Sequence, residues 1–166
     1  MFTTIPSFLE EWNNETLSTQ RVLDTLTDAS LQQRVAPDFR SMGQIAWHIA
    51  TMIHEMLSQT GLKFDAPEGD EYAPASAKTI ADTYRTASAG LAAAIQSQWT
   101  DASLAESSEL YGALWVNAHT LRFLISHEIH HRGEMIILMR QAGLSVPGIY
   151  GPTREYWLER GMQPLV

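Results

Sequence analysis

Apolar residues recur with the period of an α-helix in four separate stretches of the chain. Within each stretch they are spaced three and four residues apart, which places them on one face of a helix instead of alternating across a strand. Proline, which helix interiors exclude, is absent from three long windows that accommodate these stretches. The pattern predicts four helices, over residues 6–27, 41–61, 76–99 and 114–143.

Four helices of this length predict an all-α fold, a four-helix bundle in one domain covering residues 1–166. Ser41 is a suitable N-cap for the second helix, and Gly61 and Gly143 are suitable stops for the second and fourth. The stretch 61–76 contains two glycines and two prolines, so it predicts a long loop that could be a crossover connection. No window shows convincing strand alternation.

The tail after Gly143 is rich in turn-forming residues. It predicts a short final helix with Pro152 in its first turn.

Composition narrows the classes of function. Eleven basic residues are scattered among nineteen acidic ones, giving a formal net charge of −8, which argues against nucleic acid as a partner. The N-terminus lacks the features of a signal peptide, and the longest apolar run, 135–139, is far too short to span a membrane. The expectation is therefore a soluble cytoplasmic protein without membrane or nucleic-acid partners.

The chain has no cysteine, which excludes a disulfide scaffold, a thiolate nucleophile and a cysteine-ligated zinc site. Any metal site must therefore use His, Asp or Glu, and any sulfur chemistry must use an external thiol.

The six histidines are the candidate metal ligands that the sequence offers. His127 and His131 point within roughly 40° of each other on a helix, inside the apolar stripe. His48 lies in or beside the apolar stripe of the second helix. Three converging neutral imidazoles would suit a divalent transition metal with one open position. The alternative, three buried histidines without a metal, stays open because the sequence does not show which helices are neighbours.

Residues 127–131 also match H-E-x-x-H, the helix motif of zinc proteases, with Glu128 as general base. Glu155 or Glu159 could supply a further carboxylate ligand. A protease of that type needs an edge strand to hold its peptide, and none is predicted. A zinc hydrolase is therefore the third-ranked interpretation.

Two segments resemble the DinB-like (YfiT-type) proteins. Residues 41–50, SMGQIAWHIA, are similar to the first histidine segment of that family. Residues 127–152, HEIHHRGEMIILMRQAGLSVPGIYGP, resemble its second signature, in which H-x-x-x-H-R-G precedes a helix ending in glycine and a proline-rich turn. The resemblance implies a four-helix bundle, a homodimer, and one divalent metal per chain held by His48, His127 and His131. Zinc or nickel is the expected ion.

Characterised members of the family use low-molecular-weight thiols, some as thiol S-transferases and others as thiol-dependent isomerases. The resemblance therefore implies a metal-dependent thiol S-transferase that acts on a small thiol and an electrophilic substrate. A bound metal lowers the pKa of an external thiol, which would explain a chain without cysteine. The alternative is a metal-binding, stress-related protein without catalysis.

Four further polar residues are candidates for supporting roles. Gln44 and Glu55 could hydrogen-bond the ligand imidazoles and orient them, although surface solvation is the favoured interpretation for Glu55. Arg132 and Arg154 could bind a carboxylate of the thiol or substrate, and ordinary surface arginines are the default interpretation for both.

Overall fold

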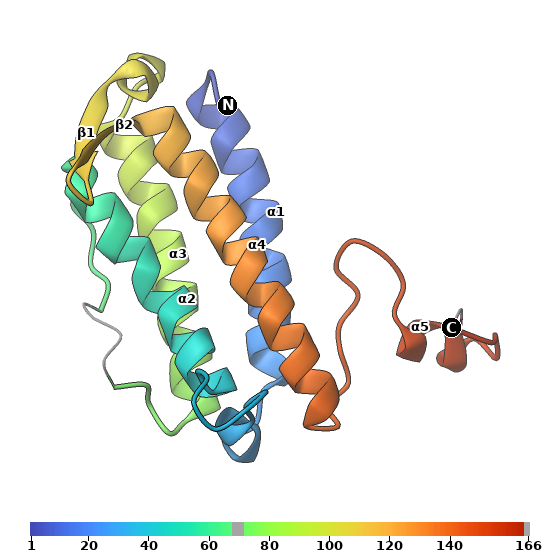
Figure 1. The fold of residues 1–166 in the computed structure, drawn as a ribbon. Coiled ribbons are helices and arrows are strands. Elements are labelled where there is room, and N and C mark those ends of the chain that lie inside the picture. The colour runs from blue at the N-terminus through green and yellow to red at the C-terminus, as the bar shows by residue number, and fades with distance from the viewer. Residues whose placement is uncertain (68–71, 165–166) are drawn as a thin grey trace.

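Four long helices form a bundle in the structure, a computed structural model that describes residues 1–67 and 72–164 (Figure 1). The predicted all-α bundle is confirmed. The long helices are α1 (Ile5–Thr25), α2 (Met42–Leu57), α3 (Ala77–Gln98) and α4 (Asn117–Gln141). The shorter elements are 3₁₀ turns at Asp28–Gln32, Ser58–Thr60 and Asp101–Ala105, strands β1 (Ser107–Leu110) and β2 (Ala113–Val116), and helix α5 (Arg154–Glu159).

The helices are arranged so that α1 and α2 each pack against both α3 and α4. The carboxyl ends of α2 and α3 lie together, since the Lys63 N–H donates to the Gln98 side-chain oxygen at 3.1 Å and the Gln98 amide donates back at 2.7 Å. These two helices are therefore parallel, and α1 and α4 run the opposite way (Figure 1). The connection 61–76 must return along the bundle, as a crossover does. Residues 68–71 of this connection lie outside the described residues.

Local hydrogen bonds explain why the helices end where they do. Ser41 and Gln44 form a reciprocal capping box at the start of α2, with the Ser41 N–H donating to Gln44 Oε1 at 2.8 Å. Gly61 follows the 3₁₀ turn Ser58–Thr60 at φ 85°, and Gly143 ends α4 at φ 73°. Leu144 N–H then donates to the Met139 carbonyl at 2.9 Å, which completes a Schellman-type stop.

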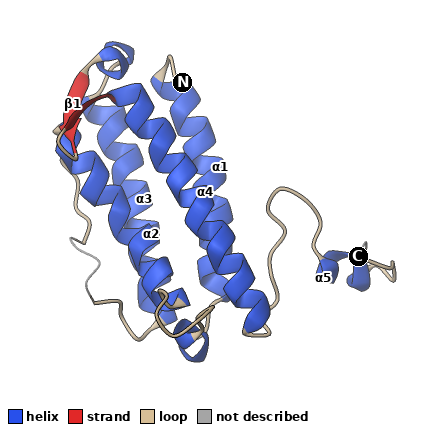
Figure 2. Cartoon of the chain, in the orientation of Figure 1, coloured by secondary structure: helices blue, strands red, loops and turns tan. Residues whose placement is uncertain are grey.

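A β-hairpin between α3 and α4 was not predicted (Figure 2). The expected start of the last helix at Leu114 is wrong, because Leu114 lies in β2 and pairs with Glu109. Tyr111 and Gly112 both have positive φ, 52° and 76°, which is what a two-residue hairpin turn of the favoured twist requires. Each strand has only four residues, too few for alternation to register as a pattern.

The core is built from the inward faces of the four long helices. It includes Phe8, Trp12, Leu23, Ile49, Met52, Met56, Ile80, Tyr84, Leu91, Leu121, Leu124 and Met135, each at most 1% exposed. Among the described helices, none is long and apolar enough to cross a membrane.

The C-terminal segment leaves the bundle after α4 and carries α5 away from it (Figure 1). The predicted short helix is present, but Pro152 precedes its N-cap Thr153 and does not lie in its first turn. An ion pair between Arg140 and Glu155 connects α5 to the end of α4.

Candidate metal centre

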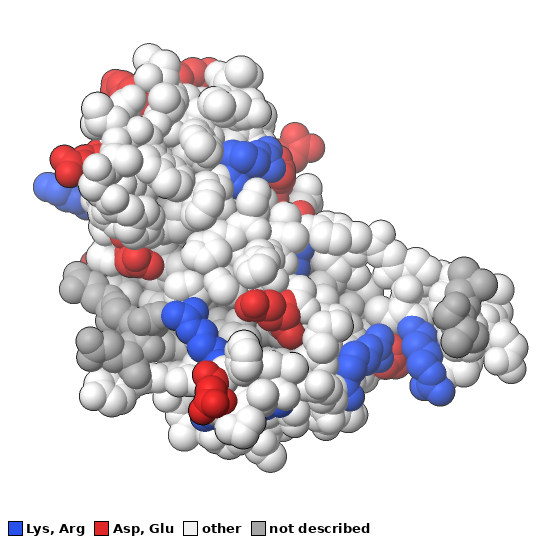
Figure 3. Space-filling view, viewed as in Figure 1, with Lys and Arg blue, Asp and Glu red and all other residues white. Residues whose placement is uncertain are grey.

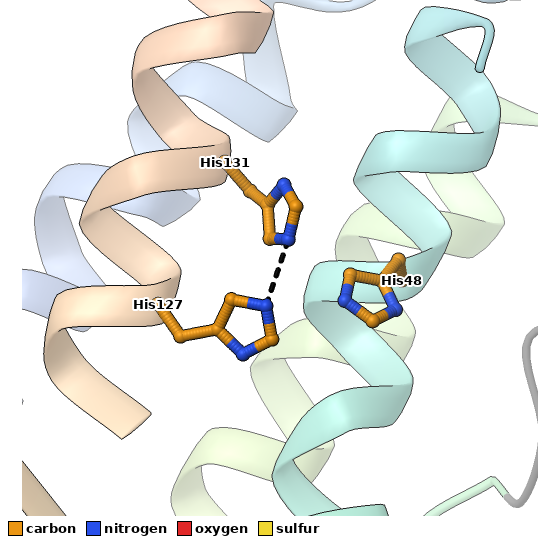
Figure 4. Close-up of side chains that lie close together, drawn as sticks. All are labelled: His48, His127 and His131. Atoms are coloured by element: carbon orange, nitrogen blue, oxygen red, sulfur yellow. Dashed lines mark hydrogen bonds between the residues drawn. The ribbon is translucent and has the colours of Figure 1, made fainter. Parts of the chain in front are cut away.

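Three histidines face one another across the contact between α2 and α4 (Figure 4). His48 comes from the middle of α2, and His127 and His131 come from successive turns of α4. The Nε2 atoms of His127 and His131 are 2.9 Å apart. The His48 ring centroid lies 4.8 Å from that of His131 and 5.3 Å from that of His127. The structure thus brings together the three side chains that the sequence singled out.

The cluster has suitable dimensions for one ion. One ring nitrogen from each histidine can be chosen so that all three lie within 4.8 Å of one another. Nitrogens bound to one tetrahedral zinc are about 3.4 Å apart, given Zn–N bonds of about 2.1 Å. Small side-chain rotations would bring the three nitrogens to that spacing.

The electrostatics keep His127 in the neutral form that a metal ligand needs. Burial, then the neighbouring charges of His131, His48, His130 and Arg40, lower the pKa of His127 to about 4. Its Nδ1 atom is buried without a hydrogen-bond partner among the described residues. Because Nε2 of His127 faces His131, the unpaired Nδ1 is the outer nitrogen of the ring, and a water could satisfy it.

Glu134 supports the cluster and was not predicted. Its Oε2 lies 2.7 Å from Nδ1 of His131, so His131 can donate from Nδ1 and present Nε2 to the other two histidines. A carboxylate that holds the outer nitrogen of a ligand imidazole fixes both its tautomer and its orientation. The signal was present in the sequence, since Glu134 follows His131 by three residues on the same helix.

We expect Glu134→Ala to weaken metal binding roughly 10–100-fold, because the His131 ring would lose the partner that orients it. The measurement is the dissociation constant for zinc, obtained by competition with a chromophoric chelator. His130→Ala is the matched control, since His130 faces the same carboxylate at 3.5 Å and is largely exposed. Equal loss of affinity in both variants would contradict a specific role for Glu134.

Aromatic side chains from the hairpin and α4 extend from the cluster on one side. Phe123 contacts the His127 ring at a centroid distance of 5.5 Å, and Trp115 of β2 contacts Phe123 at 5.1 Å. The hairpin thus contributes an apolar wall near His127. Trp115 takes this position because it lies in β2, where the sequence predicts the start of a helix.

The remaining histidines lie apart from the cluster or at its edge. His54 packs on Phe64, and His119 stacks on Trp115. His130 belongs to a second, more exposed grouping with His131 and Glu134, which shares a histidine with the first.

The two other polar candidates have structural partners in the fold. Gln44 serves in the α2 capping box, and Glu55 accepts a hydrogen bond from the Tyr111 hydroxyl at 3.1 Å. Their predicted role of orienting the ligand imidazoles remains a prediction.

Glu128 rules out the zinc-protease arrangement. Its side chain is fully buried, where its Oε1 accepts hydrogen bonds from Thr19 at 2.7 Å and Tyr84 at 2.9 Å. Those partners lie on α1 and α3, whereas His127 and His131 face α2. Burial raises the pKa of Glu128 to about 7. Glu128 therefore cannot act as a general base at the histidine cluster.

Arg132 is likewise a core residue, so its default interpretation as a surface arginine is wrong. It is 1% exposed and donates to the Glu15 carboxylate at 2.6 Å and to the Tyr150 hydroxyl at 2.5 Å. The Arg132 guanidinium, a candidate for binding a substrate carboxylate, therefore already binds the carboxylate of Glu15. Arg154 is exposed on α5.

Comparisons with known proteins agree over nearly the whole chain. The DinB family matches residues 1–162. The chain is 45% identical to YrdA of Bacillus subtilis (strain 168), described as uncharacterized, over 163 residues and 98% of each sequence.

Two solved structures show the same fold. A DinB-like protein from Bacillus cereus ATCC 10987 is 50% identical and superposes with a TM-score of 0.88, covering 90% of this chain and all of that one. The DinB-like protein YjoA from Bacillus subtilis has a TM-score of 0.66 at 18% identity, covering 86% and 97% of the two chains.

Proposed function

Because this chain belongs to the DinB family, we propose that it binds one divalent metal and acts as a metal-dependent thiol S-transferase. The observation that carries the proposal is the convergence of His48, His127 and His131 in a chain that has no cysteine. A three-imidazole site leaves a position open for a substrate, as catalytic sites do.

Each residue at the site has a separate role in the proposed reaction. His48, His127 and His131 hold the metal, and Glu134 holds the His131 ring in the orientation that ligation needs. When bound, the metal lowers the pKa of a coordinated thiol, so that thiolate is available near neutral pH. Phe123, next to His127, keeps an apolar surface beside the site.

The proposal extends to the ion and the partners. Imidazole ligands suit zinc and nickel, and zinc or nickel is the proposed cofactor. The partners are a low-molecular-weight thiol and an electrophilic small molecule, and the protein is proposed to be a homodimer.

A thiol-conjugation assay tests the catalytic part. Protein stripped with a chelator and reloaded with zinc or nickel is expected to accelerate addition of a small thiol to 1-chloro-2,4-dinitrobenzene, and His48→Ala is expected to abolish the acceleration. Equal rates for wild type and His48→Ala would contradict the transferase. Stoichiometric metal without turnover across a panel of thiols and electrophiles would favour the non-catalytic metal-binding alternative.

A further inference from the structure

A small apolar pocket lies beside the histidine cluster, in the same contact between α2 and α4. Its volume is about 260 Å³. Its apolar wall comes from the loop before α2, the first turn of α2 and the last turns of α4, and consists of Val35, Phe39, Ile45, Ile137 and Leu138. Arg40 and Glu134 are the charged residues that line it.

The pocket lies near the histidine cluster along both helices. Ile45 precedes His48 by three residues on α2, and Glu134 follows His131 by three on α4, so each of these two lining residues is offset from its histidine by about 4.5 Å along the helix axis. Glu134 belongs to both, since it lines the pocket and also binds Nδ1 of His131. A molecule held in the pocket therefore lies against the side chain that contacts His131.

Three of the apolar wall residues are largely exposed and lie around one concave site. Val35, Phe39 and Ile137 are 60%, 61% and 59% exposed. Large apolar side chains gathered around a concave site are characteristic of small-molecule pockets. The face formed by α2 and α4 is mostly uncharged, with its charged side chains in small separate groups (Figure 3).

We infer that this pocket binds the apolar part of the electrophilic substrate, an aryl or branched alkyl group. The inference rests on the proposed function for the identity of that molecule as an electrophile. The volume fits one substituted aromatic ring, since a cavity of about 150 Å³ holds benzene. The apolar wall selects a neutral hydrocarbon group, and the reactive end of the molecule projects toward His48 and His131.

Binding can be measured without metal or turnover. Nitrobenzene, an unreactive analogue, is titrated into metal-free protein with ¹³C-labelled methyl groups. We expect saturable shifts at Val35, Ile45, Ile137 and Leu138. Ile137→Gln should weaken binding roughly tenfold, because it replaces an apolar wall with an amide. Leu17→Gln is the matched control, because Leu17 is similarly exposed, at 65%, and lies on α1.

A kinetic experiment with two electrophiles tests the pocket and the transferase activity separately. In metal-loaded protein, Ile137→Gln is expected to raise KM for 1-chloro-2,4-dinitrobenzene about tenfold and KM for iodoacetamide, which has no ring, by less than about twofold. Leu17→Gln is expected to leave the rates with both electrophiles unchanged. No turnover with either electrophile would contradict the proposed transferase activity. The nitrobenzene titration would then still test whether the pocket binds an aromatic ring. Absence of methyl shifts, or shifts confined to other residues, would overturn the pocket. Pocket methyl shifts that grow with protein concentration alone would show a second copy filling it, and would also overturn the inference.

Discussion

His48→Ala is expected to purify with less than about a tenth of the metal bound by wild type, which should carry about one atom per chain. His48 is the only one of the three clustered histidines that α2 supplies. Its loss leaves two ligands on a single helix. Removing a ligand costs more than the roughly 10–100-fold loss of affinity that follows removal of a residue supporting a ligand. The measurement is elemental analysis of tag-free protein after extensive dialysis.

His54→Ala is the matched control for this experiment. His54 lies on the same helix six residues further on, where its ring packs on Phe64 and belongs to neither histidine grouping. It should retain the wild-type metal content. If neither wild type nor variant holds metal even after incubation with zinc and nickel, the three histidines are core residues and the proposed enzyme is wrong.

The part of the site that the sequence predicted is the part that obeys helical periodicity. His127 and His131 are four residues apart, so any regular helix places them on one side. Periodicity does not predict their proximity to His48. That proximity depends on contact between α2 and α4, although α3 lies between them in sequence. The family resemblance implied that pairing before the structure showed it.

The parts that were missed depend on tertiary contacts or on short turn geometry. Arg132 looks like a solvated residue in sequence, and only the approach of Glu15 from α1 makes it a core residue. The hairpin depends on two consecutive residues with positive φ. Its strands are too short to show alternation, so the sequence predicts a helix where Trp115 lies in β2. Glu134, by contrast, lies three residues after His131 on the same helix, so helical periodicity alone predicts their contact.

The burial of Arg132 predicts a large loss of stability when its charge is removed. Glu15 is 9% exposed, and its carboxylate accepts from the Tyr150 hydroxyl at 2.6 Å and from the Arg132 guanidinium at 2.6 Å. Arg132→Met removes the guanidinium. Thr19 also loses its donor, at 3.0 Å. Breaking a buried pair from one side costs about 3–5 kcal/mol, because a buried charge is left uncompensated. The free energy of unfolding of metal-free protein in urea measures this cost without a contribution from bound metal.

The chain offers a closely matched control in Arg122, which joins the same two helices. Arg122 donates to both carboxylate oxygens of Glu11, at 2.5 and 2.7 Å, and both side chains are more than a third exposed. Arg122→Met should therefore cost no more than about 1 kcal/mol, as exposed pairs do.

The double variant Glu15→Met/Arg132→Met separates two quantities. One is the cost of leaving a buried charge unpaired, and the other is the net contribution of the ion pair to the free energy of unfolding. With both members of the pair removed, neither is left as an uncompensated ion, and replacement of buried pairs by apolar residues of similar volume is often neutral or stabilising. The double variant should therefore recover most of the stability lost in Arg132→Met. A double variant as unstable as the single one would show that the Arg132 contacts themselves stabilise the fold. Similar losses in Arg132→Met and Arg122→Met would show instead that burial does not distinguish the two pairs.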